Sequence, residues 1–299
     1  MLEDTRERVI VEEQTGSFVK SERSYDGKIQ AAWSQPSTPM TYEQVAHIFE
    51  AGIKTATPSG TGPYVRSYDY PYSGTSVNTI KTYTIETGSA TVAEDQYEGE
   101  FGFVESFELS GSFGESWMMS SNWICRQMSQ TSRTAGLSVV SVNECLFPQT
   151  KLYIDASGGT IGTTQMTGVL MSASINVTTG LQIVPVGDGN LYYTGYKWTQ
   201  PEITFSLGLE LEDSSVVADQ RDSYRADDVL LFRLNITDGT RILNLDWAGK
   251  YDSVGDYSDS DGNTSVTFDG HVVSSSTDSL SFTAALTNGV ATMGAAGAP

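Results

Sequence analysis

The sequence predicts a mainly β protein whose antiparallel sheets keep one face in water. Apolar and β-branched residues alternate with polar ones in segment after segment, and Gly, Asn, Asp and Ser bound these segments. Glycine makes up 29 of the 299 residues and charged residues only 18%, unlike the charge-rich composition of disordered chains. Alternation of this kind buries one side of each strand and leaves the other solvated.

Ten segments carry the alternating pattern and are predicted as strands. They are residues 64–70, 80–87, 101–109, 117–125, 169–178, 203–212, 229–236, 241–248, 266–274 and 280–286. In each segment successive side chains point to opposite faces, so one row is apolar and the other polar.

Two segments predict helices instead. Residues 42–54 follow Thr41, a residue suited to the N-cap, and residues 214–226 follow Asp213 in the same position. Helical spacing places one set of apolar residues on a common face of each helix. These residues are Val45, Ile48, Phe49 and Ile53 in the first helix and Val216, Val217 and Tyr224 in the second.

The order of elements predicts an internal duplication. Each predicted helix is followed by four predicted strands, and the two helices begin 172 residues apart (214 − 42). Segments 103–123 and 268–288, offset by 165 residues (268 − 103), share an alternating strand, a Ser-rich turn with an acid and a second strand. We therefore predict one β-unit over 1–160 and a second over 161–299.

Three segments are too polar or too small for a core. Residues 1–26 carry seven acids and four bases and are expected to form an arm. Residues 252–265 (DSVGDYSDSDGNTS) are expected to form an acidic loop, and the C-terminal GAAGAP a flexible tail.

The charge balance excludes binding to polyanions. Against 37 acids the chain has 17 bases, a formal net charge of −20, which repels nucleic acid and anionic lipid. No apolar run approaches the roughly 18 residues of a membrane span, and the start MLEDTRERVIVEE lacks the apolar stretch of a signal peptide. We expect a soluble protein made in the cytoplasm.

No catalytic or metal-binding constellation emerges. The two histidines, His47 on the first helix and His271 in a strand, lack a GxSxG elbow, and His47 is expected on the helix surface. The acidic run DYSDSDG fits a calcium loop poorly, because Tyr257 and Phe268 fall at ligand positions. Without a CxxC motif Cys125 and Cys145 are expected to be reduced and buried. The prediction is a protein that is not an enzyme and has no cofactor or metal.

A carbohydrate-binding β-sandwich, lectin- or adhesin-like, is the alternative. Numerous acids also permit the carboxylate pair of a glycosidase, and tryptophans can stack on sugar rings. These tryptophans are Trp33, Trp117, Trp123, Trp198 and Trp247. However, Trp117 and Trp123 share the parity of one strand, as core residues of a sandwich would.

Residues 99–126, GEFGFVESFELSGSFGESWMMSSNWICR, resemble the bacteriophage tail tube family, the major tail proteins of long-tailed phages. Other segments of the chain are similar to this family too. They are TYEQVAHIFEAG, YVRSYDYP and IKTYTIETG before residue 99, and PEITFSLGLELED and VLLFRLNITDG in the second half. The likeness covers roughly 40–290 in layout. The residues that carry over are structural: Phe103, Phe107, Leu109, Trp117 and Trp123 in the paired strands, and Gly111 and Gly114 in their turn.

The resemblance implies a virion protein with an antiparallel β-sandwich and short flanking helices. In this family the inner sheets of neighbouring subunits join into a β-barrel around a lumen, and the rings stack into a tube. The implied partners are further copies of the chain, the tape-measure protein, the tail terminator and tail-tip proteins, with DNA passing but not bound. A ring would need three chains if each is duplicated, or six if the second half is an elaboration.

A negative lumen would let DNA slide without being held. The candidate lumen acids are Glu98, Glu100, Glu105 and Glu108 in the first half and Glu210, Glu212 and Asp269 in the second. Strand alternation places Glu105 and Glu108 on opposite faces, so the sequence predicts that at most one of that pair lines the channel.

Overall fold

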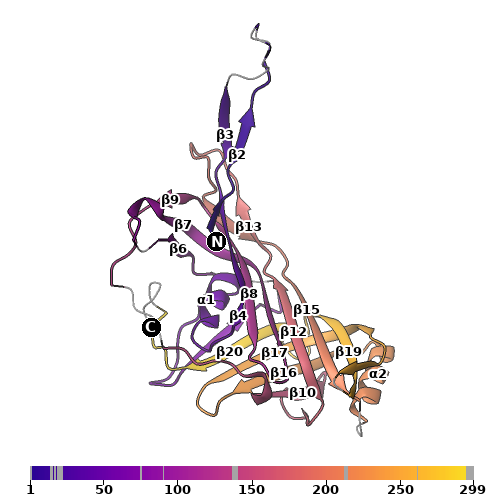
Figure 1. The fold of residues 1–299 in the computed structure, drawn as a ribbon. Coiled ribbons are helices and arrows are strands. Elements are labelled where there is room, and N and C mark those ends of the chain that lie inside the picture. The colour runs from indigo at the N-terminus through magenta and orange to yellow at the C-terminus, as the bar shows by residue number, and fades with distance from the viewer. Residues whose placement is uncertain are drawn as a thin grey trace.

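A computed structural model of the chain describes residues 2–13, 16, 18, 23–74, 76–89, 91–136, 141–211, 215–260 and 262–293. The described part is mainly antiparallel β-structure with two α-helices (Figure 1). Each of the ten predicted strand segments contains a strand, although several strands are longer than predicted. The predicted fold class is therefore confirmed.

Eight strands lie side by side in what we call the long sheet. Its order is β1-β4-β8-β7-β12-β15-β19 and then the last part of β17, and every neighbouring pair is antiparallel. The strands are β1 (Leu2–Asp4), β4 (Ala31–Pro39), β8 (Met118–Cys125), β7 (Gln96–Ser112), β12 (Leu170–Thr178), β15 (Glu202–Glu210), β19 (Asn263–Val272) and β17 (Ile242–Val254).

A second layer, the cross sheet, has the order β11-β10-β16-β17-β20-β5. Its other strands are β11 (Gln165–Met166), β10 (Thr150–Ala156), β16 (Leu230–Thr237), β20 (Phe282–Asn288) and β5 (Tyr64–Asp69). β17 belongs to both layers, because residues 242–249 pair with β16 and residues 249–254 pair with β19. The two sheets are therefore joined along one strand and enclose a common core (Figure 1).

Helix α1 (Val45–Gly52) lies between the two sheets. The ring of Phe49 packs against Tyr68 of β5 and Phe107 of β7, with centroids 5.4 and 5.8 Å apart. Seven of its eight residues are buried, so the helix is a core element, and it is shorter than the segment 42–54 predicted from the sequence. The predicted apolar face is nevertheless buried throughout, and Thr41 Oγ1 accepts a hydrogen bond from the Gln44 amide.

Helix α2 (Val216–Ala226) packs against the end of β17. The hydroxyl of Tyr251 donates to Gln220 Oε1 at 2.9 Å, and Val217 is buried. Tyr224 remains 39% exposed and Val216 is only partly buried, so the predicted apolar face of this helix is buried at Val217 alone. Gln220 occupies the buried position one turn beyond Val217 and finds its partner in Tyr251. The predicted cap Asp213 lies outside the described residues.

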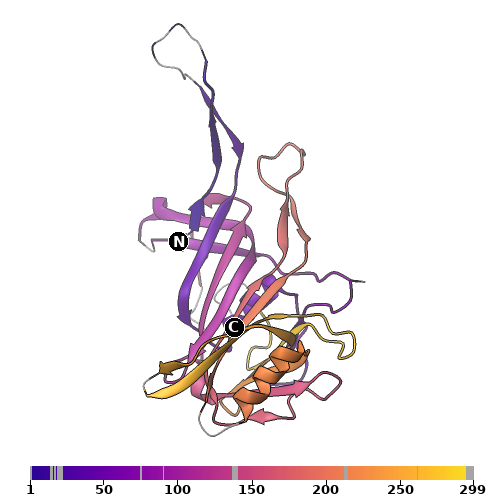
Figure 2. The same ribbon diagram turned by 90° about the vertical axis from the view of Figure 1, so that its right-hand side faces the viewer.

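Two β-hairpins project from the same end of the long sheet (Figure 2). They pair β2 (Glu7–Ile10) with β3 (Ser24–Lys28), and β13 (Leu181–Val184) with β14 (Gly195–Trp198). The arm predicted over 1–26 is thus mostly strand where it is described, because β1 pairs with β4 and β2 with β3.

Most of the acidic segment 252–265 is also strand where it is described, and not the predicted loop; residues 255–257 connect two strands. β17 continues to Val254, and β18 (Ser258–Ser260) pairs with the start of β19. Backbone pairing needs no apolar side chain, which explains how so polar a segment forms a hairpin. The predicted flexible tail, residues 294–299, lies outside the described residues.

The two segments compared in the sequence differ in their pairing. β7 and β8 are direct neighbours, whereas β17 lies between β19 and β20. The match of 103–123 with 268–288 is therefore wrong at the level of strands. On its opposite half β7 pairs with β6 (Tyr83–Gly88) and β9 (Met128–Gln130).

Candidate functional site

One side of the long sheet is a continuous polar surface, which we call the polar face. On β7, β12 and β15 every second side chain, such as Phe107, Ile175 and Phe205, is buried. The side chains that point to the other side of the long sheet, on these strands and on β4, β8 and β19, are mostly small, polar and accessible. They include Ser34, Asn122, Ser106, Ser110, Ser120, Ser172, Ser174, Asn176, Thr178, Thr204, Ser206 and Thr267.

The strand register arranges the polar face in rows that run across the sheet. Glu108 stands beside Ser120 on β8 and Asn176 on β12, and Asn176 stands beside Thr204 on β15. A neighbouring row is linked by hydrogen bonds: Ser34 Oγ donates to Asn122 Oδ1 at 2.8 Å, and Asn122 Nδ2 donates to Ser106 Oγ at 3.2 Å. The polar groups of this row thus satisfy one another.

Four of the predicted lumen acids lie on the polar face. Glu108, Glu210 and Asp269 occupy its rows, opposite Ser120, Ser265 and Ser206 respectively. Glu105 is the fourth, and it is exposed. Glu202, which was not among the predicted acids, joins them because its register partner Thr178 lies on the same side.

Glu105 and Glu108 share a face, so the prediction that they point in opposite directions is wrong. The register between β7 and β8 shifts between Val104 and Ser106, which makes Glu105 the extra residue of a β-bulge. Val104 before the bulge and Phe107 after it both point into the core. The extra residue cancels one step of alternation, and both carboxylates face solvent.

Glu98 and Glu100 lie elsewhere, on the first part of β7 beside β9. Gln127 Nε2 donates to Glu100 Oε1 at 2.9 Å, and Ser129 Oγ lies within hydrogen-bond distance of both carboxylates. Phe101, with φ of 53°, separates this part of the strand from the polar face. Glu212 lies outside the described residues.

Basic groups on the polar face gather at its β17 end and are paired with acids. Lys250 Nζ lies 2.6 Å from Asp227 Oδ2, and His271 Nδ1 lies 2.7 Å from Asp252 Oδ1. The acids Glu105, Glu108, Glu202, Glu210 and Asp269 carry the excess charge of this surface. The polar face is therefore net negative.

The aromatic motif of 99–126 is buried, with Phe103 in a small cluster beside Leu181 and Tyr193 and the other residues in the main core. Phe103, Phe107, Leu109, Trp117 and Trp123 are all at most 5% exposed. Trp117 and Trp123 point to the same side, as predicted, and their ring nitrogens donate to Thr150 Oγ1 and Ser121 Oγ, both at 2.9 Å.

The two motif glycines have different roles. Gly114 has φ of +94° and forms the predicted turn. Gly111, however, lies within β7 and not in the turn. A Cβ there would lie 2.6 Å from Cδ2 of Phe147 and 3.2 Å from Cδ2 of Trp117, so only glycine lets these rings approach the strand.

His47 is half-buried and belongs to a polar cluster beside α1, not to the helix surface as predicted. Its Nδ1 lies 3.2 Å from the Tyr83 hydroxyl, which in turn donates to Glu50 Oε2 at 3.2 Å. Burial, with the nearby charges of Lys81 and Arg66, lowers the pKa of His47 to about 4. Burial also raises the pKa of the Glu50 carboxyl. His47 is therefore neutral at physiological pH and shares a hydrogen bond with the Tyr83 hydroxyl inside this cluster.

Cys125 and Cys145 are buried free thiols, as predicted. Burial raises the pKa of the Cys125 thiol to about 12. Both are therefore unreactive packing residues. Among the residues that the structure describes, no group of three or more His, Cys, Asp or Glu side chains could hold a metal ion.

The tryptophans do not form a sugar-binding platform. Trp117, Trp123 and Trp247 are buried, Trp33 packs on Trp123 at 5.6 Å between ring centroids, and Trp198 Nε1 donates to the Asn78 carbonyl at 2.7 Å. All five rings are thus engaged in packing or hydrogen bonding within the fold. The tryptophans therefore give no support to the alternative of a carbohydrate-binding module.

The described residues thus form an antiparallel β-sandwich with a wide polar sheet surface, projecting hairpins and a filled core. Comparison with known families agrees: the family model described as phage tail tube protein matches residues 6–284. The chain therefore belongs to the phage tail tube protein family. A search of curated proteins gave no match.

Family membership makes this chain a structural component of a virion tail, where it takes part in an oligomeric assembly with other tail proteins. Within the described residues, neither helix has the length and apolar character needed to cross a membrane.

Proposed function

We propose that copies of this chain assemble into rings that stack into the tail tube, with the polar face lining the lumen. The observation that carries this proposal is the polar face itself, a wide sheet surface of hydroxyl and amide groups with a net negative charge. The tape-measure protein and then DNA would pass along it. The tail terminator and tail-tip proteins would bound the tube at its two ends.

A surface of this composition suits a conduit for DNA. Each lysine or arginine that contacts a phosphate adds to binding and would slow a sliding duplex. The polar face instead carries Glu105, Glu108, Glu202, Glu210 and Asp269, and its basic groups are already paired. At physiological salt the repulsion reaches only about 8 Å from the wall, enough to keep the duplex from adhering.

The number of strands favours three chains per ring over six. Three copies of the eight-strand long sheet give 24 strands. With strands about 4.8 Å apart and tilted by about 40°, such a barrel is about 48 Å across its backbone. Side chains of about 5 Å on each wall leave about 38 Å, which accommodates a DNA duplex together with its hydration shell. Two chains would leave about 22 Å and six about 86 Å by the same reckoning.

A ring of three chains agrees with a division of each chain into two units, 1–160 and 161–299. Each unit would supply four neighbouring strands of the wall, so that three chains present six such sets. The sheet is nonetheless continuous across both units, because β7 of the first pairs with β12 of the second.

The mass of the smallest closed assembly tests this function. The chain weighs 32.3 kDa, so native mass spectrometry of purified rings should give about 97 kDa for three chains. A mass near 194 kDa would support six chains. A strictly monomeric species at high concentration, with tail initiator proteins present, would contradict assembly altogether.

A further inference from the structure

The long sheet contains the same strand order twice. Its first four strands are β1-β4-β8-β7 and its last four are β12-β15-β19-β17. In both sets a projecting hairpin separates the first strand from the second, β2–β3 in one and β13–β14 in the other. A helix follows the second strand in both, and α1 contacts β7 as α2 contacts β17.

In each set one strand comes third along the chain, β7 in the first set and β17 in the second. These two strands have matching neighbours on one edge. β7 pairs there with β9 and then β8, and β17 pairs there with β20 and then β19. Each ladder contains a bulge with an acidic residue as its extra residue, Glu105 in β7 and Asp252 in β17. These bulges fix how the two strands correspond, with Phe107 matching Val254.

The opposite edges differ in one respect. On β7 this edge pairs with β6 and then, over Ser106–Ser112, with β12. On β17 it pairs with β16 only as far as Gly249. Among the described residues, no strand pairs with this edge of β17 beyond Gly249. The position that β12 fills beside β7 is therefore open beside β17.

We propose that β1 of a second copy of this chain fills the open position beside the end of β17, just as β12 fills it beside β7. β1 is the strand that corresponds to β12, since each is the first of its set and each pairs with the next strand in the same way. This inference rests on the proposed ring and names the edges that close it. The internal junction β7·β12 is the template for the junction between chains.

The register of the template gives the register of the new junction. Phe107 stands opposite Val177 and Glu108 opposite Asn176 in the internal junction. In the new junction Val254 takes the place of Phe107, and Asp4 of the second copy takes the place of Val177, so these two residues stand opposite each other. In the same way, Gly255 in the place of Glu108 stands opposite Glu3 of the second copy in the place of Asn176. Both Glu108 and Asn176 lie on the polar face, so Gly255 and Glu3 would continue that face from one chain to the next.

The bulge at Asp252 does not argue against this pairing. Bulges and lysines on an edge strand commonly prevent unwanted pairing, and β17 has both Asp252 and Lys250 at this point. However, the bulge at Glu105 is followed directly by the strand pairing of Ser106 with Thr178. A bulge at this place in the fold is therefore compatible with a neighbour on the opposite edge.

The projecting hairpins support the same arrangement. The β13–β14 hairpin covers apolar residues beside the internal junction, where the Tyr193 hydroxyl donates to the Phe101 carbonyl at 3.1 Å and the ring packs on Phe103. The β2–β3 hairpin instead extends into solvent with Ile10 64% and Tyr25 57% exposed (Figure 2). A second copy beside β1 supplies the surface that this hairpin lacks within its own chain.

Cysteine cross-linking tests the inferred edges. Residues directly opposite in an antiparallel pair have Cα atoms about 4.5–5.5 Å apart, within the range that a disulfide spans. The variant Glu3→Cys/Gly255→Cys should therefore form covalent dimers and trimers on mild oxidation of assembled rings. The native Cys125 and Cys145 are buried and leave a low background.

A matched variant tests assembly through the other sheet. Val65→Cys/Gln165→Cys places exposed thiols on β5 and β11, the two ends of the cross sheet, and should not cross-link. Rings of both variants are first counted by electron microscopy under reducing conditions. Rings without the Glu3–Gly255 cross-link, or with the Val65–Gln165 one, would overturn the edge assignment and leave the ring intact. Absence of rings in the unmodified chain as well would overturn the proposed function and this inference with it.

Discussion

Glu105 and Asp252 occupy matching positions, each as the extra residue of a β-bulge in the longest strand of its half of the sheet. Before each bulge the strand points a large side chain, Val104 or Tyr251, into the core. The bulge therefore turns an acidic residue toward the polar face in both halves. This relationship was hidden in the sequence because the two strands share no obvious motif around these residues.

Charge reversal on the polar face should slow DNA without blocking assembly. Lysine at Glu105, Glu108, Glu210 and Asp269 would replace repulsion of phosphates by attraction. We expect tubes of normal diameter and a reduced ejection rate, with a larger effect at low ionic strength because salt screens the interaction. In vitro ejection kinetics at two salt concentrations would measure it.

The control reverses four exposed acids away from the polar face: Glu94, Glu144, Asp188 and Asp222. This variant has the same net charge and should eject DNA at the normal rate. Equal rates for both variants and the unmodified tube at low salt would rule out the electrostatic role of the polar face.

Gly111→Ala should destabilise the subunit. The added Cβ would clash with the rings of Phe147 and Trp117, and overpacking of this kind costs about 1–3 kcal/mol. Gly195→Ala on β14 is the control, because a Cβ added there would have no other atom within 4 Å and the φ of Gly195 lies outside the left-handed region. Urea unfolding should show the loss for the first variant alone.

Stability should fall as the pH drops from about 6.5 toward 4. Because burial lowers the pKa of His47 in the folded chain to about 4 while its ordinary value is 6.5, the unfolded chain binds the proton more readily in this range. The stability that neutral His47 contributes is full above pH 6.5 and is lost as the pH falls to about 4, on the order of 3 kcal/mol in all. His47→Gln should flatten this part of the stability curve, as thermal unfolding between pH 7 and pH 4 would show. An unchanged slope in this variant would assign the dependence to other groups.

The two proposed units should not fold alone. β5 of the first pairs with β20 of the second, and β10 of the first pairs with β16 of the second. Each fragment, 1–160 or 161–299, would lose a neighbouring strand and expose the apolar core residues beside it. We expect no cooperative unfolding transition for either fragment by circular dichroism, and recovery of one when they are mixed. A cooperative transition in an isolated fragment would contradict this interlocking.

Alternation of apolar and polar residues predicted the strands well where the pattern was regular. It failed where a strand forms through backbone pairing with its neighbours although its own sequence does not alternate. β4 was missed because Pro36 and Pro39 interrupt AAWSQPSTP, but a strand near the sheet edge tolerates them with a register shift between Gln35 and Thr38. The bulge at Glu105 could not be predicted, since it exists only in relation to the partner strand β8. The short strands of 2–28 likewise depend on neighbours that lie elsewhere in the chain.

The acids predicted for the lumen divide in the same way between regular and irregular strands. Glu108, Glu210 and Asp269 were found because they stand on regular strands, and alternation fixes their side of the sheet. Glu202 was missed although it belongs to the same alternating row as Thr204 and Ser206. Glu98 and Glu100 were predicted together with them but lie on the first part of β7, which Phe101 with its positive φ separates from the polar face.

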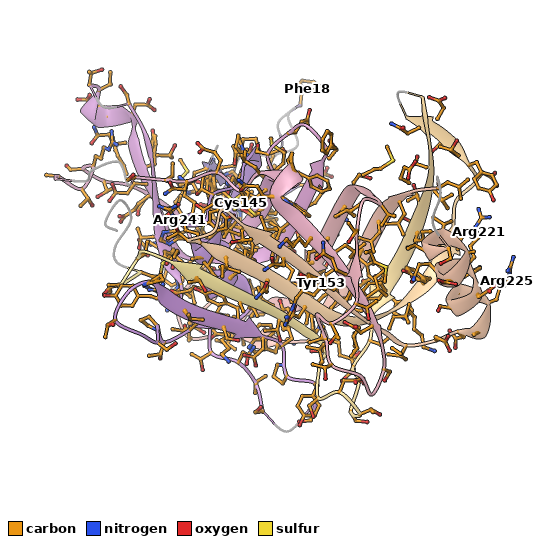
Figure 3. All side chains as sticks on the ribbon, turned by 90° about the horizontal axis from the view of Figure 1, so that it is seen from below. Phe18, Cys145, Tyr153, Arg221, Arg225 and Arg241 are labelled. Atoms are coloured by element: carbon orange, nitrogen blue, oxygen red, sulfur yellow. The ribbon has the colours of Figure 1, made fainter. Side chains whose placement is uncertain are left out.

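The far end of the long sheet should change its surroundings on assembly. Helix α2 covers one side of β17 there, and Arg221 and Arg225 project from it at the periphery of the molecule (Figure 3). Arg221 lies over the ring of Tyr257 at 4.5 Å, next to the open edge. Hydrogen exchange at residues 250–257 and 2–10 should slow in tubes relative to the free subunit, and equal protection in both states would count against contacts at these segments.

Electron cryomicroscopy of tubes grown from the purified chain tests the central claim most directly. We predict rings of three chains with a continuous β-barrel wall, the polar face inward and a lumen about 38 Å wide. A tube whose lumen is lined by the opposite side of the long sheet, or by α2 and the cross sheet, would contradict it.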